Sequence, residues 1–324
     1  MGVTNFDVVR ANVIIGASLI TQGNVWHVMP GTGADGQSGR TPEEAVATLA
    51  KALSLASANQ NDIVLLYGQS NTAADTTDYQ SATLDWSKDL VHLIGVGAHS
   101  PFSNRARIAQ LSTATGVSPL VKLSADGCVV KNVSIFHGVA DATSLVAMQI
   151  TGTRNVVEDC HIAGMGHATM VTAGATSLKL DGCSENILRR CTIGLDTITR
   201  DATSEGEVWV DGAATRNILE DCLIVAFIGD AAYEHVVLED ATAIDRFLMF
   251  KNCVFYSISA NNATPQDQIF EFKASLTQGH VILHDSVYVT DDASCVWVTT
   301  GEGSLRNTRG QTEAAAAGGE ATIL

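Results

Sequence analysis

Four cysteines recur at a constant interval of 31 residues, and this period constrains the fold more than any other feature of the chain. Each cysteine sits at the same place in a repeated phrase: NVVEDCHI, NILRRCTI, NILEDCLI and FLMFKNCVF. A period of about 20 to 50 residues is typical of solenoids, in which each unit buries its apolar face against its neighbours. The repeated residues are Cys160, Cys191, Cys222 and Cys253.

Each repeat contains two short apolar strands joined by irregular segments. The cysteine strand has equivalents from IVLLY at 63–67 to VILHDSVYV at 281–289, and a second strand, such as LKL at 178–180, precedes the later ones. Val, Ile, Thr and Gly are dense and no helical period appears between residues 118 and 300, which argues against an α-solenoid. The repeat therefore predicts an all-β parallel β-helix of about eight or nine coils.

The cysteines should form one column inside this solenoid, because consecutive coils lie about 4.8 Å apart. Val96, Val133 and Ser286 occupy the same register in other coils, which favours an apolar core ladder over a metal or redox array. The chain has seven cysteines, without a CxxC pair or zinc-ligand spacing. We expect buried reduced thiols, no disulfide framework and no cofactor.

The segment TPEEAVATLAKALSLA predicts a helix that caps the first coil, since an uncovered solenoid end would template aggregation. Thr41 is the expected N-cap, Pro42 the first helical residue, and Glu44 completes a capping box. The resulting domains are an N-terminal arm (1–23), an initial strand, loop and capping helix (24–62), the β-helix (63–300) and a flexible Ala/Gly-rich tail (301–324).

The N-terminal arm contains VVRANVIIGASLI, which is too apolar to remain free in water. It could pair as a strand on the solenoid, or dock onto a partner or a neighbouring subunit; we favour docking. The arm lacks the basic stretch of a signal peptide, and no apolar run is long enough to span a bilayer. The net charge of −16 opposes binding to nucleic-acid phosphates. We therefore expect a soluble, cytoplasmically synthesised protein with neither nucleic acid nor membrane as a partner.

The segment VMPGTGADGQSGRTPEEAVATLAKAL, followed by NDIVLLYG, resembles the start of right-handed parallel β-helix proteins of the pectate-lyase-like superfamily, particularly phage tailspikes and other virion proteins. The resemblance covers residues 24 to 300. It implies a right-handed fold rather than an activity, because the superfamily includes lyases, hydrolases and non-catalytic proteins. It also implies a homotrimer located on a virion after synthesis in the host cytoplasm.

Asp181 and Asp211 are the candidate catalytic pair if the chain is an enzyme. Their equivalent places on consecutive coils put their backbones about 5 Å apart, near the carboxylate separation of retaining glycosidases. Each precedes a glycine, so stacked turns explain them without chemistry, and we favour that interpretation. The alternation of Glu158-Asp159 with Arg189-Arg190 predicts a solvated or turn-forming edge.

Metal binding has one weak candidate, Asp35 in the loop PGTGADGQSG. Hard cations take several oxygen ligands, and this loop offers one carboxylate. We therefore assign no metal site from the sequence.

The outer face of the second-strand sheet carries a mixed series of side chains: Lys122, Gln149, Lys179, Trp209, Val237, Glu271 and Trp297. Trp209, Val237 and Trp297 predict a subunit interface or a sugar-binding platform on this face. The alternative is that a loop folds back and covers them.

The leading functional hypothesis is a non-enzymatic phage virion structural protein, such as a capsid decoration, spike or fibre-like component that contacts other virion proteins through its arm. It is favoured by the missing secretion signal, the lack of a dense acid/base cluster and the apolar termini that flank a rigid rod. The first alternative is a tailspike depolymerase, a glycoside hydrolase or polysaccharide lyase acting on host surface polysaccharide. The second is a carbohydrate-binding adhesin. Enzymatic activity stays open, with the non-enzymatic hypothesis preferred.

Overall fold

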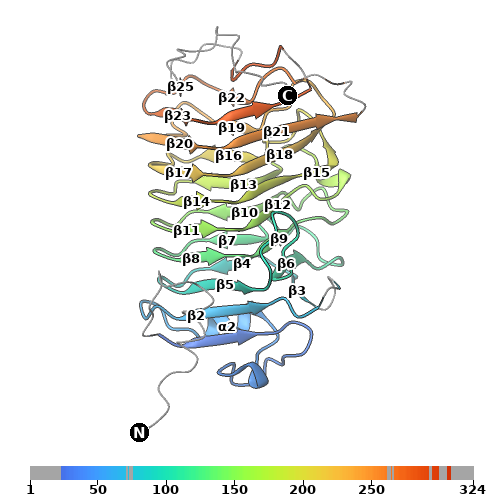
Figure 1. Ribbon diagram of the computed structural model, residues 1–324, viewed down its shortest axis with the longest axis vertical. Coiled ribbons are helices and arrows are strands. Elements are labelled where there is room, and N and C mark those ends of the chain that lie inside the picture. Colours follow the sequence, from blue (N-terminus) through green and yellow to red (C-terminus); the bar gives the residue numbers. More distant parts are fainter. Residues whose placement is uncertain are drawn as a thin grey trace.

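The protein is a solenoid of three parallel β-sheets whose coils stack from the N-terminal end to the C-terminal end (Figure 1). This computed structural model describes residues 23–70, 72, 76–260, 264, 266–291, 294–298 and 305–307. Residues 1–22 of the predicted arm, and all of the predicted tail except residues 305–307, lie outside this set. Among the described residues, no helix is long and apolar enough to cross a membrane.

The sheets are named A, B and C. Sheet A has ten strands: β1 (Val25–Val28), β2 (Ile63–Tyr67), β5 (His92–Val96), β8 (Val129–Lys131), β11 (Val156–Glu158), β14 (Ile187–Arg189), β17 (Asn217–Glu220), β20 (Phe247–Lys251), β23 (His280–His284) and β25 (Leu305–Asn307). Sheet B has eight: β3 (Thr77–Gln80), β6 (Arg107–Gln110), β9 (Ser134–Phe136), β12 (His161–Ala163), β15 (Thr192–Arg200), β18 (Leu223–Ile228), β21 (Val254–Ser259) and β24 (Val287–Val289). Sheet C has seven: β4 (Leu84–Trp86), β7 (Val121–Leu123), β10 (Val146–Ile150), β13 (Thr176–Asp181), β16 (Val208–Asp211), β19 (Val236–Leu238) and β22 (Phe270–Phe272). The described helices are η1 (Pro42–Glu44), α2 (Leu49–Leu55) and η2 (Ala168–Met170).

Each complete coil runs from sheet C to sheet A and then to sheet B, as in β10, β11 and β12. Seven coils, from β4 to β24, have a strand in every sheet. The sequence predicted about eight or nine coils. The difference arises at the N-terminal end, where α2 precedes β2 and sheet C begins only at β4. The predicted all-β right-handed parallel β-helix is confirmed.

The capping helix is not continuous, and in this respect the sequence prediction is wrong. Thr41 accepts the Glu44 N–H at 3.3 Å, but it caps η1, a single 3-10 turn. The chain then becomes extended, because Val46 N–H donates to the His27 carbonyl at the edge of β1 at 3.0 Å. Helix α2 begins anew after its own N-cap, Thr48. The apolar side of α2 still covers the first coil, with its buried side chains in the main core.

Three residues of the predicted tail belong to sheet A. Leu305–Asn307 form β25, which pairs in parallel with β23, so sheet A extends beyond residue 300. At the other end, β1 pairs with β2 in the same sheet. The β-helix therefore includes residues that the sequence placed in its flanking segments.

A left-handed residue marks the corner between sheets A and B in successive coils. The φ values of these residues lie between 50° and 56°, and they are Asn132, Asp159, Arg190, Asp221, Asn252 and Asp285. Asn and Asp tolerate this conformation better than other non-glycine residues. Arg190 is the exception, and its guanidinium bonds Asp159 of the coil before it at 2.8 Å. The corner sends the chain sharply from one sheet to the next.

The cysteine column follows this corner and is buried, with no thiol more than 2% exposed. Each thiol points to a carbonyl of the preceding coil, as Cys191 does to Val157 O at 3.5 Å. Burial raises the pKa of Cys160, Cys191 and Cys222 well above the usual thiol value. These cysteines are therefore inert core residues. Val96 departs from the expected register and packs instead with Ile94 outside the main core.

The left-handed corner gives a test at Asp221. Asp221→Gly should be more stable than Asp221→Ala by about 1 kcal/mol, because both lose the carboxylate and only alanine is strained at positive φ. Urea unfolding measures the difference. The preceding strand residue, Glu220, is the matched control: there alanine should be more stable than glycine. The same order at both positions would contradict the corner conformation.

Candidate functional site

The outer face of sheet C brings the two candidate carboxylates together. Asp181 in β13 pairs directly with Asp211 in β16. Lys179 Nζ lies 3.1 Å from Asp211 Oδ2 and 3.6 Å from Asp181 Oδ2. Gln149, one coil earlier, donates to Asp181 Oδ2 at 2.5 Å. One ammonium and one amide thus hold a carboxylate pair whose side chains are 30% and 27% exposed.

The same aspartates also shape stacked turns, as the sequence predicted. Gly182 and Gly212 have φ of 62° and 67°, and Gly212 N–H donates to Asp211 Oδ1 at 2.8 Å. A Cβ on Gly212 would lie 2.8 Å from Asp181 Oδ1, so the turn admits only glycine without displacing that carboxylate. The turn role is observed, and no contact in the structure assigns the pair an additional catalytic role.

Trp209 lies beside this pair and is held on two sides. Lys179 Nζ sits 3.8 Å from the centre of its ring, a cation–π contact. Its indole N–H donates to Glu239 Oε2 at 2.9 Å. The Lys273 ammonium forms ion pairs with Glu239 at 2.9 Å and with Glu205 at 2.6 Å. The half-buried indole is therefore part of a connected lattice of charges along sheet C.

The predicted exposure of Val237 and Trp297 is wrong. Val237 points to the outer side between Trp209 and Glu271, but it is 1% exposed. Trp297 is 9% exposed and packs against Phe255, Phe270 and Tyr288. The neighbouring residue Val296 forms a parallel bridge with Gln268 at the C-terminal end of the solenoid. There the Trp297 ring belongs to the main core. Of the three predicted interface or sugar-platform residues, only Trp209 reaches the surface.

The Asp35 carboxylate is hydrogen-bonded by groups of the protein itself. Its carboxylate accepts the N–H groups of Ala47 and Thr48 at 2.9 and 3.0 Å, and the Thr48 hydroxyl at 2.8 Å. These bonds fix the start of α2. Within the described part of the chain, no group of three or more His, Cys, Asp or Glu is arranged to hold a metal ion.

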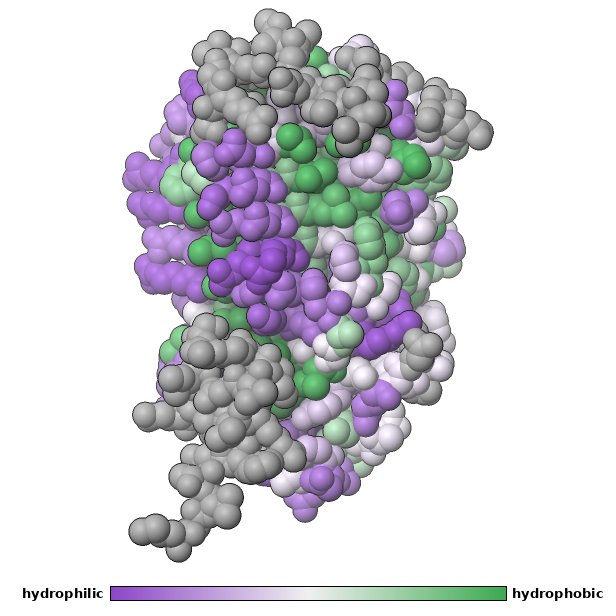
Figure 2. All heavy atoms as spheres, viewed as in Figure 1, coloured by the Kyte–Doolittle hydropathy of each residue, from purple (hydrophilic) through white to green (hydrophobic). Residues whose placement is uncertain are grey.

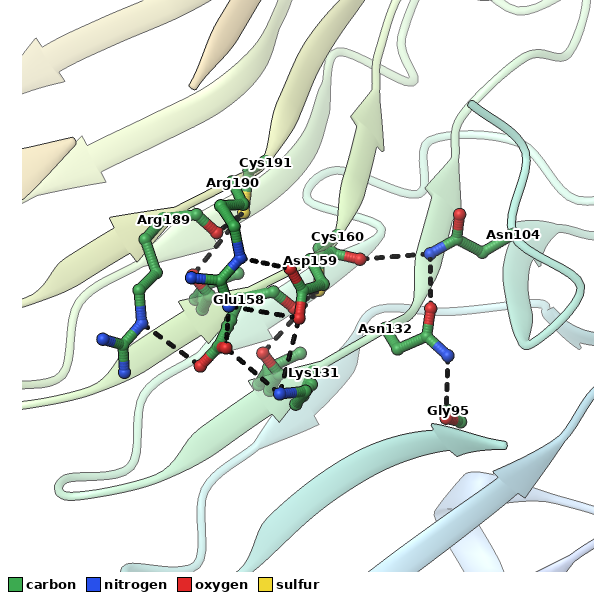
Figure 3. A network of polar contacts seen from close by, with 12 residues as sticks. Gly95, Asn104, Lys131, Asn132, Glu158, Asp159, Cys160, Arg189, Arg190 and Cys191 are labelled. Carbon is green, nitrogen blue, oxygen red and sulfur yellow. Dashed lines mark hydrogen bonds and ion pairs between the residues drawn. The ribbon is translucent and has the colours of Figure 1, made fainter. Parts of the chain in front are cut away.

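The charged residues at the sheet A corner form an ion ladder (Figure 3). Glu158 accepts Lys131 at 3.1 Å and Arg189 at 3.2 Å, and Arg190 bonds Asp159 at 2.8 Å. Partial burial works to raise the pKa of Glu158 and Asp159, but these cations outweigh it and hold both values below the usual range. In Figure 2 hydrophilic residues form a band along the middle coils. The ladder is a charged turn edge rather than an acid/base pair.

A hollow of about 350 Å³ adjoins this ladder and was not evident from the sequence. Its lining is half polar by residue, with Lys131, Asp159, Asn132 and His99, and includes Ile94 to Val96 of β5. Asn104, 28 residues before Asn132, donates to the Asn132 side chain at 3.0 Å and to the Asp159 carbonyl at 3.1 Å (Figure 3). The loop after β5 thus fixes the wall of the hollow. Sequence reasoning could not place this loop, because its contacts are made one and two coils later.

Comparisons with known proteins bear on the fold. No protein-family model matches the sequence, and a search of curated proteins gives no match. Among solved structures, pectate lyase Pel9A superposes with a TM-score of 0.57 at 12% identity, covering 84% of this chain. The chain matches 64% of the length of that lyase.

Two esterases give similar results. A pectin methylesterase in complex with a hexasaccharide has a TM-score of 0.55 at 13% identity, covering 85% of this chain and 81% of its own. Pectin methylesterase PemA from Erwinia chrysanthemi has a TM-score of 0.51 at 12% identity, covering 86% and 81%. The chain has the pectate-lyase-like β-helix fold. At these identities the likeness extends to the fold alone.

A buried ion pair in this β-helix was missed by the sequence analysis. The side chains of Arg200 and Glu207 are fully buried and bond at 2.7 Å. Arg200 also donates to the carbonyls of Met165 and Gly164, and Tyr233 donates to Glu207 at 3.0 Å. The network fastens the end of β15 to the neighbouring coils. Arg200 ends β15 and Glu207 directly precedes β16, and neither charged residue gave a sequence signal of burial.

Removing the cation from this network should be costly. Arg200→Met leaves the Glu207 carboxylate buried without its partner, and we expect a loss of about 3–5 kcal/mol of unfolding free energy. Arg154→Met removes an ion pair with Glu185 whose arginine side chain is 74% exposed, and should cost less than about 1 kcal/mol. Chemical denaturation of the two variants tests the contrast. Equal losses would contradict the assigned burial.

Buried histidines give the β-helix a pH dependence. Burial lowers the pKa of His92, His137 and His235 to about 4. The unfolded value is about 6.5, so unfolded chains bind more protons between these limits. The stability from each neutral histidine is full above pH 6.5 and falls as the pH approaches 4. Asp78 and Glu234 act oppositely, because burial raises their pKa to about 6 and about 7.

Replacement of His92 isolates one of these contributions. His92 Nδ1 accepts the Val129 N–H at 3.1 Å, and a glutamine oxygen can accept the same bond. His92→Gln should therefore flatten the acid loss of stability by up to about 1.4 kcal/mol per pH unit. Thermal unfolding from pH 7 to 4 measures it against wild type. His284→Gln, at a side chain 42% exposed, is the control, and an equal effect there would contradict the prediction.

Proposed function

We propose that this β-helix is a non-enzymatic structural protein of a phage particle, displayed as a capsid decoration, spike or fibre-like component. The observation that carries the proposal is Lys179, whose ammonium lies 3.1 and 3.6 Å from the two candidate carboxylates. It occupies the place between Asp181 and Asp211 where a glycosidic bond would have to enter. In this proposal the two aspartates stabilise the stacked turns of a rigid β-helix and take part in no reaction.

The location and assembly belong to the same proposal. They are supported by the likeness of the segment at residues 24–62 to the start of phage tailspike and virion β-helices. We propose a homotrimer that contacts other virion proteins near its N-terminal end, which would present the rod outward. Immunogold electron microscopy of a particle containing the chain would locate it.

A second function, polysaccharide processing, is favoured by a specific arrangement. Asp181, Asp211 and Trp209 lie on one outer face, where the carboxylates are 30% and 27% exposed. Structures with the same fold are a pectate lyase and pectin methylesterases, one of them in complex with a hexasaccharide. If Lys179 moves aside when a polysaccharide binds, the two carboxylates could act as the centre of a hydrolase or lyase on host surface polysaccharide. Binding without turnover would make the protein an adhesin.

Product assays separate these functions. Wild type and Asp211→Asn are incubated with host capsule and lipopolysaccharide, and reducing ends and unsaturated products are measured. We expect both proteins to match the blank, because the carboxylates are held by Lys179. Turnover by wild type that is lost in Asp211→Asn would overturn the structural proposal. Asp126→Asn removes one carboxylate from another Asp-Gly turn, and its amide oxygen can still accept the Thr153 N–H, so it is the matched control for a change of surface charge.

A further inference from the structure

Arg107, on the outer side of sheet B, is a cation for which the described residues provide no counter-ion. It begins β6, and the next residue, Ile108, points into the main core, so Arg107 points outward. The side chain is half-buried, and its Nε atom is buried without a hydrogen-bond partner. Within the described part of the chain it forms no ion pair, whereas every arginine from Arg154 to Arg246 pairs with a carboxylate.

Aromatic rings lie on both sides of this guanidinium along the stack. The Arg107 Cζ atom is 4.3 Å from the centre of the Phe136 ring, a cation–π contact. A Cβ on Gly138 would lie 2.6 Å from Phe136 Cε1, so this glycine leaves the space that the ring occupies. Ala109, the next outward residue of β6, pairs with Tyr79 on one side and with Phe136 on the other. Tyr79 is 45% exposed, so the fixed cation lies beside a ring that is open to solvent.

The described loops beside Arg107 contact other residues. The loop between β5 and β6 crosses to β12, where the Ser103 N–H donates to His161 Nδ1 at 3.0 Å. Its Phe102 ring lies 5.4 Å from the His161 ring and is itself 38% exposed. After β9 the chain buries His137 completely. The terminal nitrogens of Arg107 are not among the buried atoms, and no described residue bonds them.

A cation in this setting is unfavourable for folding alone. Removing a charge from water is costly unless a partner compensates it. Partial burial lowers the pKa of Arg107, and the nearby Arg105 adds to this effect. The chain contains 35 Asp and Glu residues, yet none of those that the structure describes is paired with Arg107. A ligand that carries a carboxylate would supply the missing counter-ion, because the guanidinium fork matches both carboxylate oxygens.

We propose that Arg107, Tyr79 and Phe136 form a binding site for an acidic sugar. The sugar carboxylate pairs with the guanidinium, which the Phe136 ring holds in place, and the apolar face of the sugar ring lies against Tyr79. The site is on sheet B, so the inference goes beyond the proposed structural role and does not involve Asp181 or Asp211.

The size and charge of the site favour this class of ligand. A carboxylate that reaches Arg107 lies beside Tyr79, so its carrier needs an apolar side, which a sugar ring offers. One cation and one open ring are too small an area for a stable protein interface, which buries about 800 Å² on each partner. The net charge of −16 opposes a doubly charged phosphate more strongly than a singly charged carboxylate.

A titration of the full chain followed by NMR of arginine side chains tests the ligand class. Sodium glucuronate should shift the Arg107 Nε–H signal to saturation. Its neutral methyl ester should bind about tenfold more weakly or less, because the charge-assisted hydrogen bonds are lost. Acetyl-glutamyl amide, a carboxylate without a sugar ring, and glucose 6-phosphate should also bind more weakly. No saturable shift, or binding of any of these three as tight as that of glucuronate, would overturn the proposal.

Arg107→Met separates a binding role from a structural one. Methionine keeps the apolar contact with Phe136 and removes the unpaired charge, so the Tm should equal or exceed that of wild type. Glucuronate binding, followed by saturation transfer from the protein to the sugar, should fall about tenfold or more. Arg154→Met, at an arginine 74% exposed and paired with Glu185, should bind like wild type. Retained binding in Arg107→Met, or a lowered Tm, would overturn the proposal.

Discussion

Hydrogen bonding between parallel strands of successive coils is the constraint on which the rest of the structure depends. Val156 N–H donates to Cys128 O at 2.8 Å, Ile187 N–H to Asn155 O at 2.9 Å, and the pattern continues along sheet A. Because this register is constant, each side chain lies against its equivalent in the next coil. Columns of thiols, left-handed corners and charges follow from it, and so does the contact between Asp181 and Asp211. Stability is then built from interfaces between neighbouring coils.

The sequence was sufficient wherever stacking decides the outcome. The 31-residue period predicted the fold, the buried cysteines and the adjacency of Asp181 and Asp211. The bridge made by Lys179 could also have been found, because a residue two positions before Asp181 in a strand lies on the same face. The remainder depends on contacts outside the repeat. Trp297 joins the core only at the solenoid end, and the predicted helix divides because Val46 pairs with β1.

Function in this β-helix must lie on its outer faces, since large side chains fill the interior. Sheet C presents a lattice in which Lys179 joins Asp181, Asp211 and Trp209. Sheet A presents an ion ladder over its middle coils and a buried apolar cluster over its first ones. The contacts of Lys179 on sheet C bear on the choice between the proposed structural role and a polysaccharide-processing role.

Thiol labelling of the intact chain tests the central claim, the stacked column of buried residues, most directly. Under native conditions Cys160, Cys191, Cys222 and Cys253 should resist an aromatic disulfide reagent, because each is at most 2% exposed. Mass spectrometry after labelling across a urea series should show the four thiols becoming reactive together at the unfolding midpoint. Rapid native labelling of any of them, or labelling at separate urea concentrations, would contradict a single stacked solenoid with this column at its core.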